Sequence, residues 1–285
     1  MKIKLINTQR VLSPTNITLA DYVINPYRGC EFGCLYCYSQ ANKNIQKENF
    51  SGFLGIKINA PAVLEKELKL NNPKRVLLGS VTECFQYQEL KYNLTKQILI
   101  ILNNHNIPYT ILTKSHLIKN YLNLIAQNKE NTIYFTLNLA GDKMIKMFEP
   151  NSPPLKQRLT AINEIIKAKV NLRIHLGPFI PFVSNLEEIF KIIPEKAQKI
   201  DIELYHNKQG NFKEILNITE KYLGKSLKQK LENIYKTKEN YLSFGEKIRN
   251  QAKALKKRYN FKVFYIVPDF NQYYNSLINY KNELT

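Results

Sequence analysis

Three cysteines in one short segment are the residues of this 285-residue chain best suited to chemistry. Cys30, Cys34 and Cys37 follow the spacing C-x3-C-x2-C within the run NPYRGCEFGCLYCYS. Thiolates so close in sequence are typical metal ligands, and the two glycines between and before them let the backbone curl around a bound group. Four cysteines normally close a [4Fe–4S] cluster, so three leave one iron open to a cofactor or substrate.

A zinc site is the alternative interpretation, because three cysteines and one histidine form a common closed zinc set. The nearest histidine, His105, lies far along the chain, so a fourth ligand would have to come from a distant part of the fold. A disulfide framework does not fit four cysteines, three of them clustered, in a chain this large. The spacing therefore favours an iron–sulfur cluster over zinc, and both over inert structural cysteines.

The cysteine motif, with Tyr36 directly before its last cysteine, resembles the radical S-adenosylmethionine (SAM) superfamily. The longer run NPYRGCEFGCLYCYS is similar to the branch that contains spore photoproduct lyase and related DNA repair photolyase-like proteins. The resemblance implies that the open iron chelates SAM and that the reduced cluster cleaves SAM to a 5′-deoxyadenosyl radical, which abstracts a hydrogen atom from substrate. It also implies an electron donor such as flavodoxin or ferredoxin.

The same resemblance assigns roles to residues outside the cluster motif. Tyr36 and Tyr38 match tyrosines placed near SAM and in radical relay, and Lys114 matches a lysine at a strand end that binds the SAM carboxylate. In the run Gly79–Glu83, Ser80, Thr82 and Glu83 are polar substitutes for the residues that bind the SAM amine in many members of the superfamily. Thr136 and Asn138 occupy a strand end close to SAM. Packing aromatics and solvated surface are the competing interpretations of these residues.

Cys84 stands where the lyase has the cysteine that returns a hydrogen atom to the repaired thymine radical. A weak S–H bond suits that role, whereas free cysteine is also among the most commonly buried residue types. Two further runs resemble the branch. Glu149 and Arg158 are interpreted as a structural ion pair, and Gly177–Pro181 as a backbone wall beside the adenosine.

The elements that must position these residues alternate between strand and helix. Such alternation predicts an α/β fold with a parallel sheet, here a full or partial (β/α) TIM-type barrel of the radical SAM kind with a C-terminal helical extension. In such barrels the chemistry lies at the carboxyl ends of the strands. The periodicity predicts strands at Phe53–Ile58, Arg75–Ser80, Tyr109–Thr113, Thr132–Leu137, Asn171–Leu176, Lys199–Leu204 and Phe261–Val267, and helices at Ala60–Leu70, Leu94–Asn103, His116–Gln127, Leu155–Ala168, Leu186–Ala197 and Leu242–Tyr259.

Residues 1–204 are expected to form the radical SAM core, and residues 205–285 a basic helical insertion plus the last strand of the same domain. The segment 221–262 holds thirteen Lys and Arg against three Glu, about half of the chain's net charge of +19. This excess fits contact with DNA or RNA, and it fits a solvated helical face equally well. Short apolar runs and a charged N-terminus predict a cytoplasmic protein without a membrane segment.

Three functions follow as hypotheses. The first is a spore photoproduct lyase-like enzyme that repairs nucleic acid by radical chemistry, with Cys84 as hydrogen donor. The second is a radical SAM enzyme that acts on RNA, a peptide or a metabolite. The third is a zinc-stabilised nucleic-acid-binding module without catalysis. The sequence leaves the oligomeric state open.

Overall fold

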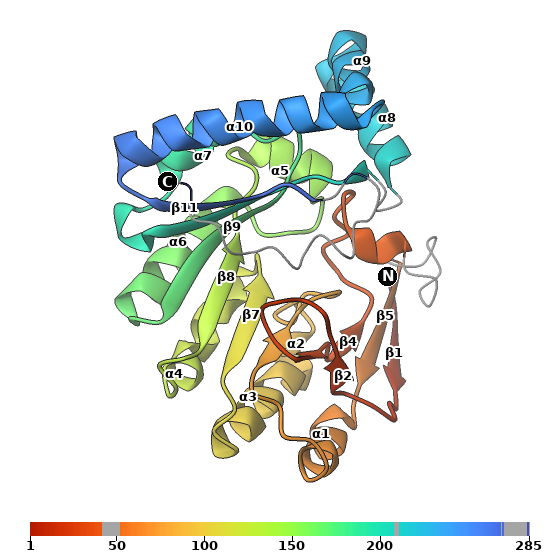
Figure 1. Ribbon diagram of the computed structural model, residues 1–285. Coiled ribbons are helices and arrows are strands. Elements are labelled where there is room, and N and C mark those ends of the chain that lie inside the picture. The colour runs from red at the N-terminus through yellow and green to blue at the C-terminus, as the bar shows by residue number, and fades with distance from the viewer. Residues whose placement is uncertain (42–51, 208–210, 269, 271–283, 285) are drawn as a thin grey trace.

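A computed structural model describes residues 1–41, 52–207, 211–268, 270 and 284 (Figure 1). Its main sheet has eight strands in the order β11-β10-β9-β8-β7-β6-β3-β2, with every neighbouring pair parallel except the antiparallel pair of β2 and β3. The strands are β2 (Ser13–Pro14), β3 (Tyr22–Ile24), β6 (Val76–Leu78), β7 (Tyr109–Thr113), β8 (Thr132–Thr136), β9 (Asn171–Phe179), β10 (Lys199–Leu204) and β11 (Lys262–Ile266).

Helices cover the outer face of this curved sheet, so the central strands are apolar on the face that they bury (Figure 1). The covering helices are α1 (Ala60–Leu68), α3 (Leu94–Asn104), α4 (Leu122–Ile125), α6 (Leu155–Lys167), α7 (Leu186–Ile192) and α10 (Lys238–Tyr259). Two further helices, α2 (Glu89–Tyr92) and α5 (Asp142–Phe148), lie in loops that follow strands. Within the described residues the edge strands β2 and β11 are not paired with each other, so the barrel is partial.

One predicted strand belongs to a different sheet. The run predicted at Phe53–Ile58 forms β5 (Phe53–Lys57), which pairs with β1 (Lys2–Ile6) and β4 (Tyr27–Arg28) in a separate three-stranded sheet. Leu54 and Ile56 pack there with Tyr27 and Leu94 in a small core of their own. The residue pattern of a buried strand is the same in either sheet, and its pairing partners are distant in sequence.

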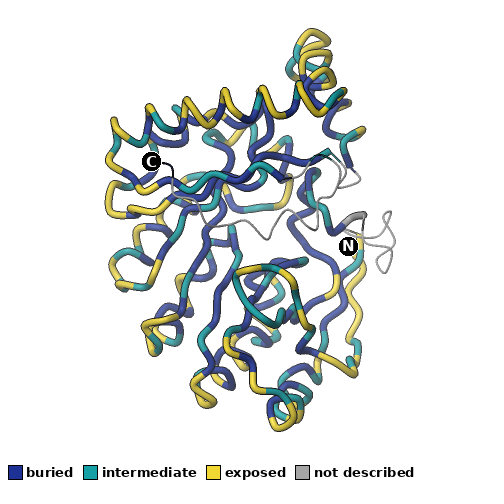
Figure 2. Tube along the Cα trace, viewed as in Figure 1, coloured by how far each residue is buried: buried dark blue, intermediate teal, exposed yellow. Residues whose placement is uncertain are grey.

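The segment that departs from the strand and helix alternation forms a helical layer over one end of the sheet. It contains α8 (Phe212–Leu223), α9 (Lys225–Ile234) and the beginning of α10. One face of α10 is buried and the other is exposed along its length (Figure 2). After α10 the chain returns to the sheet, where β11 pairs in parallel with β10.

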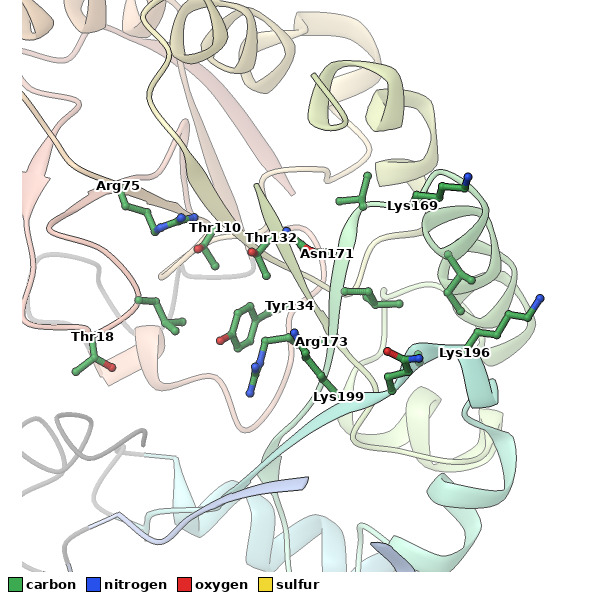
Figure 3. A pocket seen from close by; sticks show the side chains of 16 residues that line it. Thr18, Arg75, Thr110, Thr132, Tyr134, Lys169, Asn171, Arg173, Lys196 and Lys199 are labelled. Atoms are coloured by element: carbon green, nitrogen blue, oxygen red, sulfur yellow. The ribbon is translucent and has the colours of Figure 1, made fainter. Parts of the chain in front are cut away.

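The inner face of the partial barrel is polar between β8, β9 and β10. Arg173 makes a bidentate ion pair with Asp201, with Nε–Oδ2 and Nη2–Oδ1 distances of 2.7 and 2.6 Å. Its guanidinium lies over the rings of Tyr134 and Phe264, 5.4 and 4.1 Å from their centroids. Tyr134 and Arg173 border a cavity of about 590 Å³ at the amino ends of the strands (Figure 3). No helix in the described part of the chain has the length and apolarity needed to cross a bilayer.

Candidate active site

A cavity of about 530 Å³ lies at the opposite mouth, where the strands of the main sheet end. The loops after β6 and β7 and the end of β8 form one wall, the cysteine loop a second, and the strand ends of β9 and β10 a third. Most residues predicted for cluster and SAM binding border it: Cys30, Cys34, Cys37, Tyr36, Tyr38, Ser80, Lys114 and Thr136. The structure therefore gathers in one pocket residues that are up to a hundred positions apart in sequence.

The cysteine loop curls in the way that its glycines allow. Gly29 and Gly33 have φ angles of 88° and 60°, in the left-handed region that favours glycine. The thiols of Cys30 and Cys34 are buried, whereas Cys37 is partly exposed, and none of the three forms a disulfide. Burial raises the pKa of the Cys34 thiol to about 12, although the Lys114 ammonium opposes the rise. Such thiols become thiolates when a metal centre supplies compensating positive charge.

The arrangement of the cysteines bears on what they hold. In the described residues no group of three or more His, Cys, Asp or Glu side chains is arranged to hold one metal ion. The three thiols nevertheless border the same cavity on a single loop. Three thiols on one loop beside a cavity could hold a cluster whose fourth iron faces that cavity.

Lys114 lies at the centre of a buried polar network beside the cluster loop. Its Nζ is 2.6 Å from the Tyr36 hydroxyl, 3.1 Å from Glu149 Oε1 and 3.3 Å from Cys34 Sγ. Burial alone would lower the pKa of Lys114, but Cys34, Glu149 and Tyr36 outweigh it and raise the pKa. Lys114 is thus a fixed positive charge at the edge of the pocket; its predicted bond to the SAM carboxylate stays a prediction.

Glu149 stabilises this network as its shared hydrogen-bond acceptor. Its carboxylate accepts hydrogen bonds from Arg158, Tyr36 and Lys114, and both Glu149 and Arg158 are fully buried. Burial would raise the pKa of Glu149, but the two cations lower it to about 2. The predicted Glu149–Arg158 ion pair is present. Its link through Lys114 to the cluster loop was not predicted, because nothing local in the sequence joins these three positions.

The loop after β6 contributes further polar groups. Tyr38 donates its hydroxyl proton to the backbone oxygen of Ser80, and the Ser80 hydroxyl accepts from Asn25 Nδ2 at 3.1 Å. The Glu83 carboxylate is already hydrogen-bonded within the protein. It accepts hydrogen bonds from the Thr113 hydroxyl at 2.7 Å and from the Lys114 backbone N–H at 3.1 Å. Ser80 is therefore the polar side chain of this loop best placed to meet a ligand.

Two predicted residues lie behind the pocket wall. Asn138 is fully buried, with Nδ2 donating to the Pro178 backbone oxygen at 3.2 Å and Oδ1 accepting from the Tyr36 hydroxyl at 3.4 Å. Cys84 is also fully buried, and its Sγ lies 3.5 Å from where a Cβ on Gly79 would stand. Because Gly79 itself borders the cavity, the structure puts Cys84 one layer beneath the lining.

Two cavity residues were missed from the sequence. His175 and Glu203 project from β9 and β10 into the third wall, with His175 Nε2 and Glu203 Oε2 3.7 Å apart. Both lie two positions after another polar residue in a buried strand, in the patterns Arg-x-His and Asp-x-Glu. Polar residues at every second position of a buried parallel strand signal an inward polar face.

Comparison with known proteins agrees with this geometry. A family model described as the radical SAM superfamily matches residues 24–193, well over half of the chain. The chain belongs to the radical SAM superfamily. The cofactors of this family are a [4Fe–4S] cluster and SAM, and the three thiols around one pocket fit the first of them.

Curated relatives have no described function. An uncharacterized protein of Methanocaldococcus jannaschii is 27% identical over 186 residues, which are 65% of this chain and 70% of the relative. An uncharacterized protein of Mycobacterium bovis is 28% identical over 176 residues, which are 59% of this chain and 52% of the relative. The chain thus matches only about half the length of the mycobacterial protein.

Solved structures of spore photoproduct lyase share the fold. A cysteine-to-serine mutant of that lyase superimposes with a TM-score of 0.58 at 16% identity over 78% of this chain and 66% of the lyase. A lyase mutant with bound AdoMet and dinucleoside spore photoproduct gives a TM-score of 0.56 at 16% identity over the same shares. The match confirms the predicted α/β partial barrel, and the chain covers just under two thirds of the lyase.

Proposed function

We propose that this protein cleaves SAM reductively and uses the radical so produced to abstract a hydrogen atom from a substrate in the same pocket. The single observation that carries the proposal is the cavity that brings Cys30, Cys34 and Cys37 together with Tyr38, Ser80 and Lys114. When bound, the cluster supplies an electron and an open iron, and SAM supplies the 5′-deoxyadenosyl group.

The residues of the chain bind and orient in this scheme. Lys114 offers a positive charge to the SAM carboxylate, and the hydroxyls of Ser80 and Thr136 offer hydrogen bonds along the wall next to it. Glu149 and Arg158 hold the Lys114 side chain by a buried ion-pair network. The apolar share of the lining keeps bulk water away from a reactive radical.

The more specific proposal is a lyase reaction on a pyrimidine lesion in nucleic acid. It is supported by the likeness to spore photoproduct lyase in fold and by the cysteine at position 84. Burial raises the pKa of the Cys84 thiol well above its ordinary value, so the S–H bond needed for hydrogen-atom donation is retained. Because Cys84 lies beneath Gly79, donation requires that the loop after β6 shift to bring Sγ into the cavity.

A second candidate keeps the radical chemistry and changes the substrate to RNA, a peptide or a metabolite. The position of Cys84 behind the lining favours it, because a product radical that regains its hydrogen atom from 5′-deoxyadenosine needs no thiol. Replacement of Cys84 by alanine separates the two candidates. The lyase proposal expects abortive or diverted products, whereas the second candidate expects normal product.

Anaerobic reconstitution tests the shared part of both candidates. The protein is loaded with iron and sulfide, reduced with dithionite and incubated with SAM, and 5′-deoxyadenosine is measured by chromatography. About four irons per chain and formation of 5′-deoxyadenosine are expected, and Cys30→Ala should remove both. Cys84→Ala is the matched control, since it removes a buried thiol outside the cluster motif. A protein that binds one zinc and leaves SAM intact contradicts the proposal.

A further inference from the structure

His175 and Glu203 form a polar site on the cavity wall that the cluster and SAM residues leave unassigned. The residues predicted near SAM come from the cysteine loop, the loops after β6 and β7, and the end of β8, whereas His175 and Glu203 come from the neighbouring strands β9 and β10. His175 stands opposite Thr136 in the register of β8 and β9, one layer below the carboxyl edge of the sheet. The pair therefore faces the interior of the cavity from the side away from the cysteine loop.

The hydrogen-bonding capacity of His175 is unused by the described residues. Its Nδ1 has no hydrogen-bond partner there, and the 3.7 Å between its Nε2 and Glu203 Oε2 is longer than a hydrogen bond. Only 13% of the His175 side chain and 10% of the Glu203 side chain are exposed. Nδ1 is buried away from the cavity, whereas Nε2 lies beside Glu203 on the cavity wall and is the atom at which a ligand would complete the hydrogen bonding of the ring.

The local fold is adapted to hold this ring in place. A Cβ added to Gly177 would stand 2.1 Å from His175 Nε2, so only glycine at position 177 leaves space for the imidazole. Gly177 and Pro178 border the same cavity as the ring. Burial, with Lys114 and Arg173, lowers the pKa of His175 to about 4, so the ring is neutral near pH 7 and has one N–H donor.

The charges around His175 and Glu203 disfavour an anionic group as the ligand of this pair. An ionised Glu203 only accepts hydrogen bonds and repels phosphate or carboxylate. Of the two cations near the ring, Arg173 is engaged by Asp201, and Lys114 is assigned above to the SAM carboxylate, so neither is left for a second anion. A neutral ligand that suits the pair presents a carbonyl oxygen to the His175 N–H and an adjacent N–H to Glu203. A cyclic amide has both groups on one edge, whereas the trans amide of a peptide directs them to opposite sides.

We propose that His175 and Glu203 bind the cyclic amide edge of the substrate, as a nucleobase presents it, and orient that substrate beside SAM. This proposal rests on the proposed radical function and specifies the substrate that its pocket receives. In a nucleic acid the base enters the cavity while the phosphates stay outside, away from Glu203, which requires that the nucleotide leave its stack.

The test uses thymidine and 3-methylthymidine as probes, because methylation at N3 removes the N–H and keeps the carbonyl groups. Binding of both to the cluster-loaded protein with SAM is measured by equilibrium dialysis. Wild-type protein should bind thymidine about tenfold more tightly than 3-methylthymidine. Glu203→Gln should remove that preference, and His175→Phe should weaken binding of both probes. SAM affinity, measured in the same experiment without nucleoside, should stay within about twofold.

Lys199→Gln is the matched control, because Lys199 begins β10 at the other cavity and should change neither affinity. Equal wild-type affinity for the two nucleosides, or no binding of either, overturns the proposal. So does a Glu203→Gln variant that loses SAM affinity, because the pair then belongs to the SAM site. A wild-type protein that makes no 5′-deoxyadenosine contradicts the proposed function instead, and this result is distinguishable because nucleoside binding is scored separately.

Discussion

Glu149 neutralises two buried cations, and its removal is expected to destabilise the protein strongly. In Glu149→Gln the guanidinium of Arg158 stays buried without a counter-charge, which costs about 3–5 kcal/mol of unfolding free energy. Urea denaturation of the cluster-free protein measures this loss. The control is Glu246→Gln, because the Glu246–Arg249 pair is exposed and contributes less than about 1 kcal/mol. Equal effects of the two substitutions would contradict the buried network.

His175 makes stability depend on pH in a defined direction. Its pKa falls from the ordinary 6.5 to about 4 in the folded protein, so between these values the unfolded chain binds more protons. Its contribution to stability is complete above pH 6.5 and is lost as pH falls toward 4, by about 3 kcal/mol in all. Urea midpoints at pH 7.0, 5.5 and 4.5 should therefore fall less steeply in His175→Gln than in wild type. An unchanged slope would show that the ring is not held neutral.

At the scale of the element, Gly177 near the end of β9 has no room for a side chain. In Gly177→Ala the new Cβ would overlap the His175 ring and force it to move, which should cost about 1–3 kcal/mol and weaken nucleoside binding. Gly141→Ala is the matched control, because a Cβ at Gly141 meets nothing within 4 Å. Thermal unfolding of both variants measures the difference. A Gly177→Ala variant as stable as the control would mean that the ring has alternative space.

The side chain of Asn211, the residue directly before helix α8, forms hydrogen bonds with the cluster loop. Asn211 Nδ2 donates to the backbone oxygen of Leu35 and, at 3.4 Å, to that of Cys37, and its Oδ1 accepts from the Tyr205 hydroxyl. Asn211→Leu removes these hydrogen bonds, so the loop should hold its cluster less firmly, with loss of iron to a chelator about tenfold faster. Asn240→Leu, on the exposed side of α10, is the control. Equal rates of iron loss would contradict this role.

The elements show where sequence reasoning succeeds and where it fails. Long periodic runs such as Asn171–Phe179 and Lys238–Tyr259 were found close to their true bounds, because burial repeats regularly along them. Strands of two or three residues, such as β2, β3 and β4, give too little periodicity to define, and the sheet to which Phe53–Lys57 belongs depends on distant partners. The cluster cysteines are recognisable because their ligand spacing is local. His175 and Glu203 become a pair only through the register of β9 and β10.

At the scale of the whole molecule, α9 and α10 have many exposed residues (Figure 2), and Lys236, Lys247 and Arg249 are among the exposed basic side chains of this helical layer. If this surface binds nucleic acid, each Lys or Arg that contacts a phosphate adds to the salt dependence of binding, and its removal should reduce that dependence. Lys236→Gln, Lys247→Gln and Arg249→Gln together should decrease the slope of log K against log salt by about 2.7 for duplex DNA. Fluorescence anisotropy at several salt concentrations measures it. Lys2→Gln with Lys4→Gln is the control, and equal slopes in all three proteins would assign the charge to solvation.

The contact between Asn211 and the cluster loop also sets an order of events during synthesis. All three cluster cysteines leave the ribosome early, within the first 37 residues, but the side chain that fastens their loop comes from residue 211. Lys114 and Glu149, which flank Cys34, are likewise made after it. During most of translation, the three thiols therefore lack the side-chain contacts that hold their loop in the folded protein. Productive insertion of iron and sulfide therefore belongs to a late stage of maturation, and cells must protect these thiols from oxidation until then.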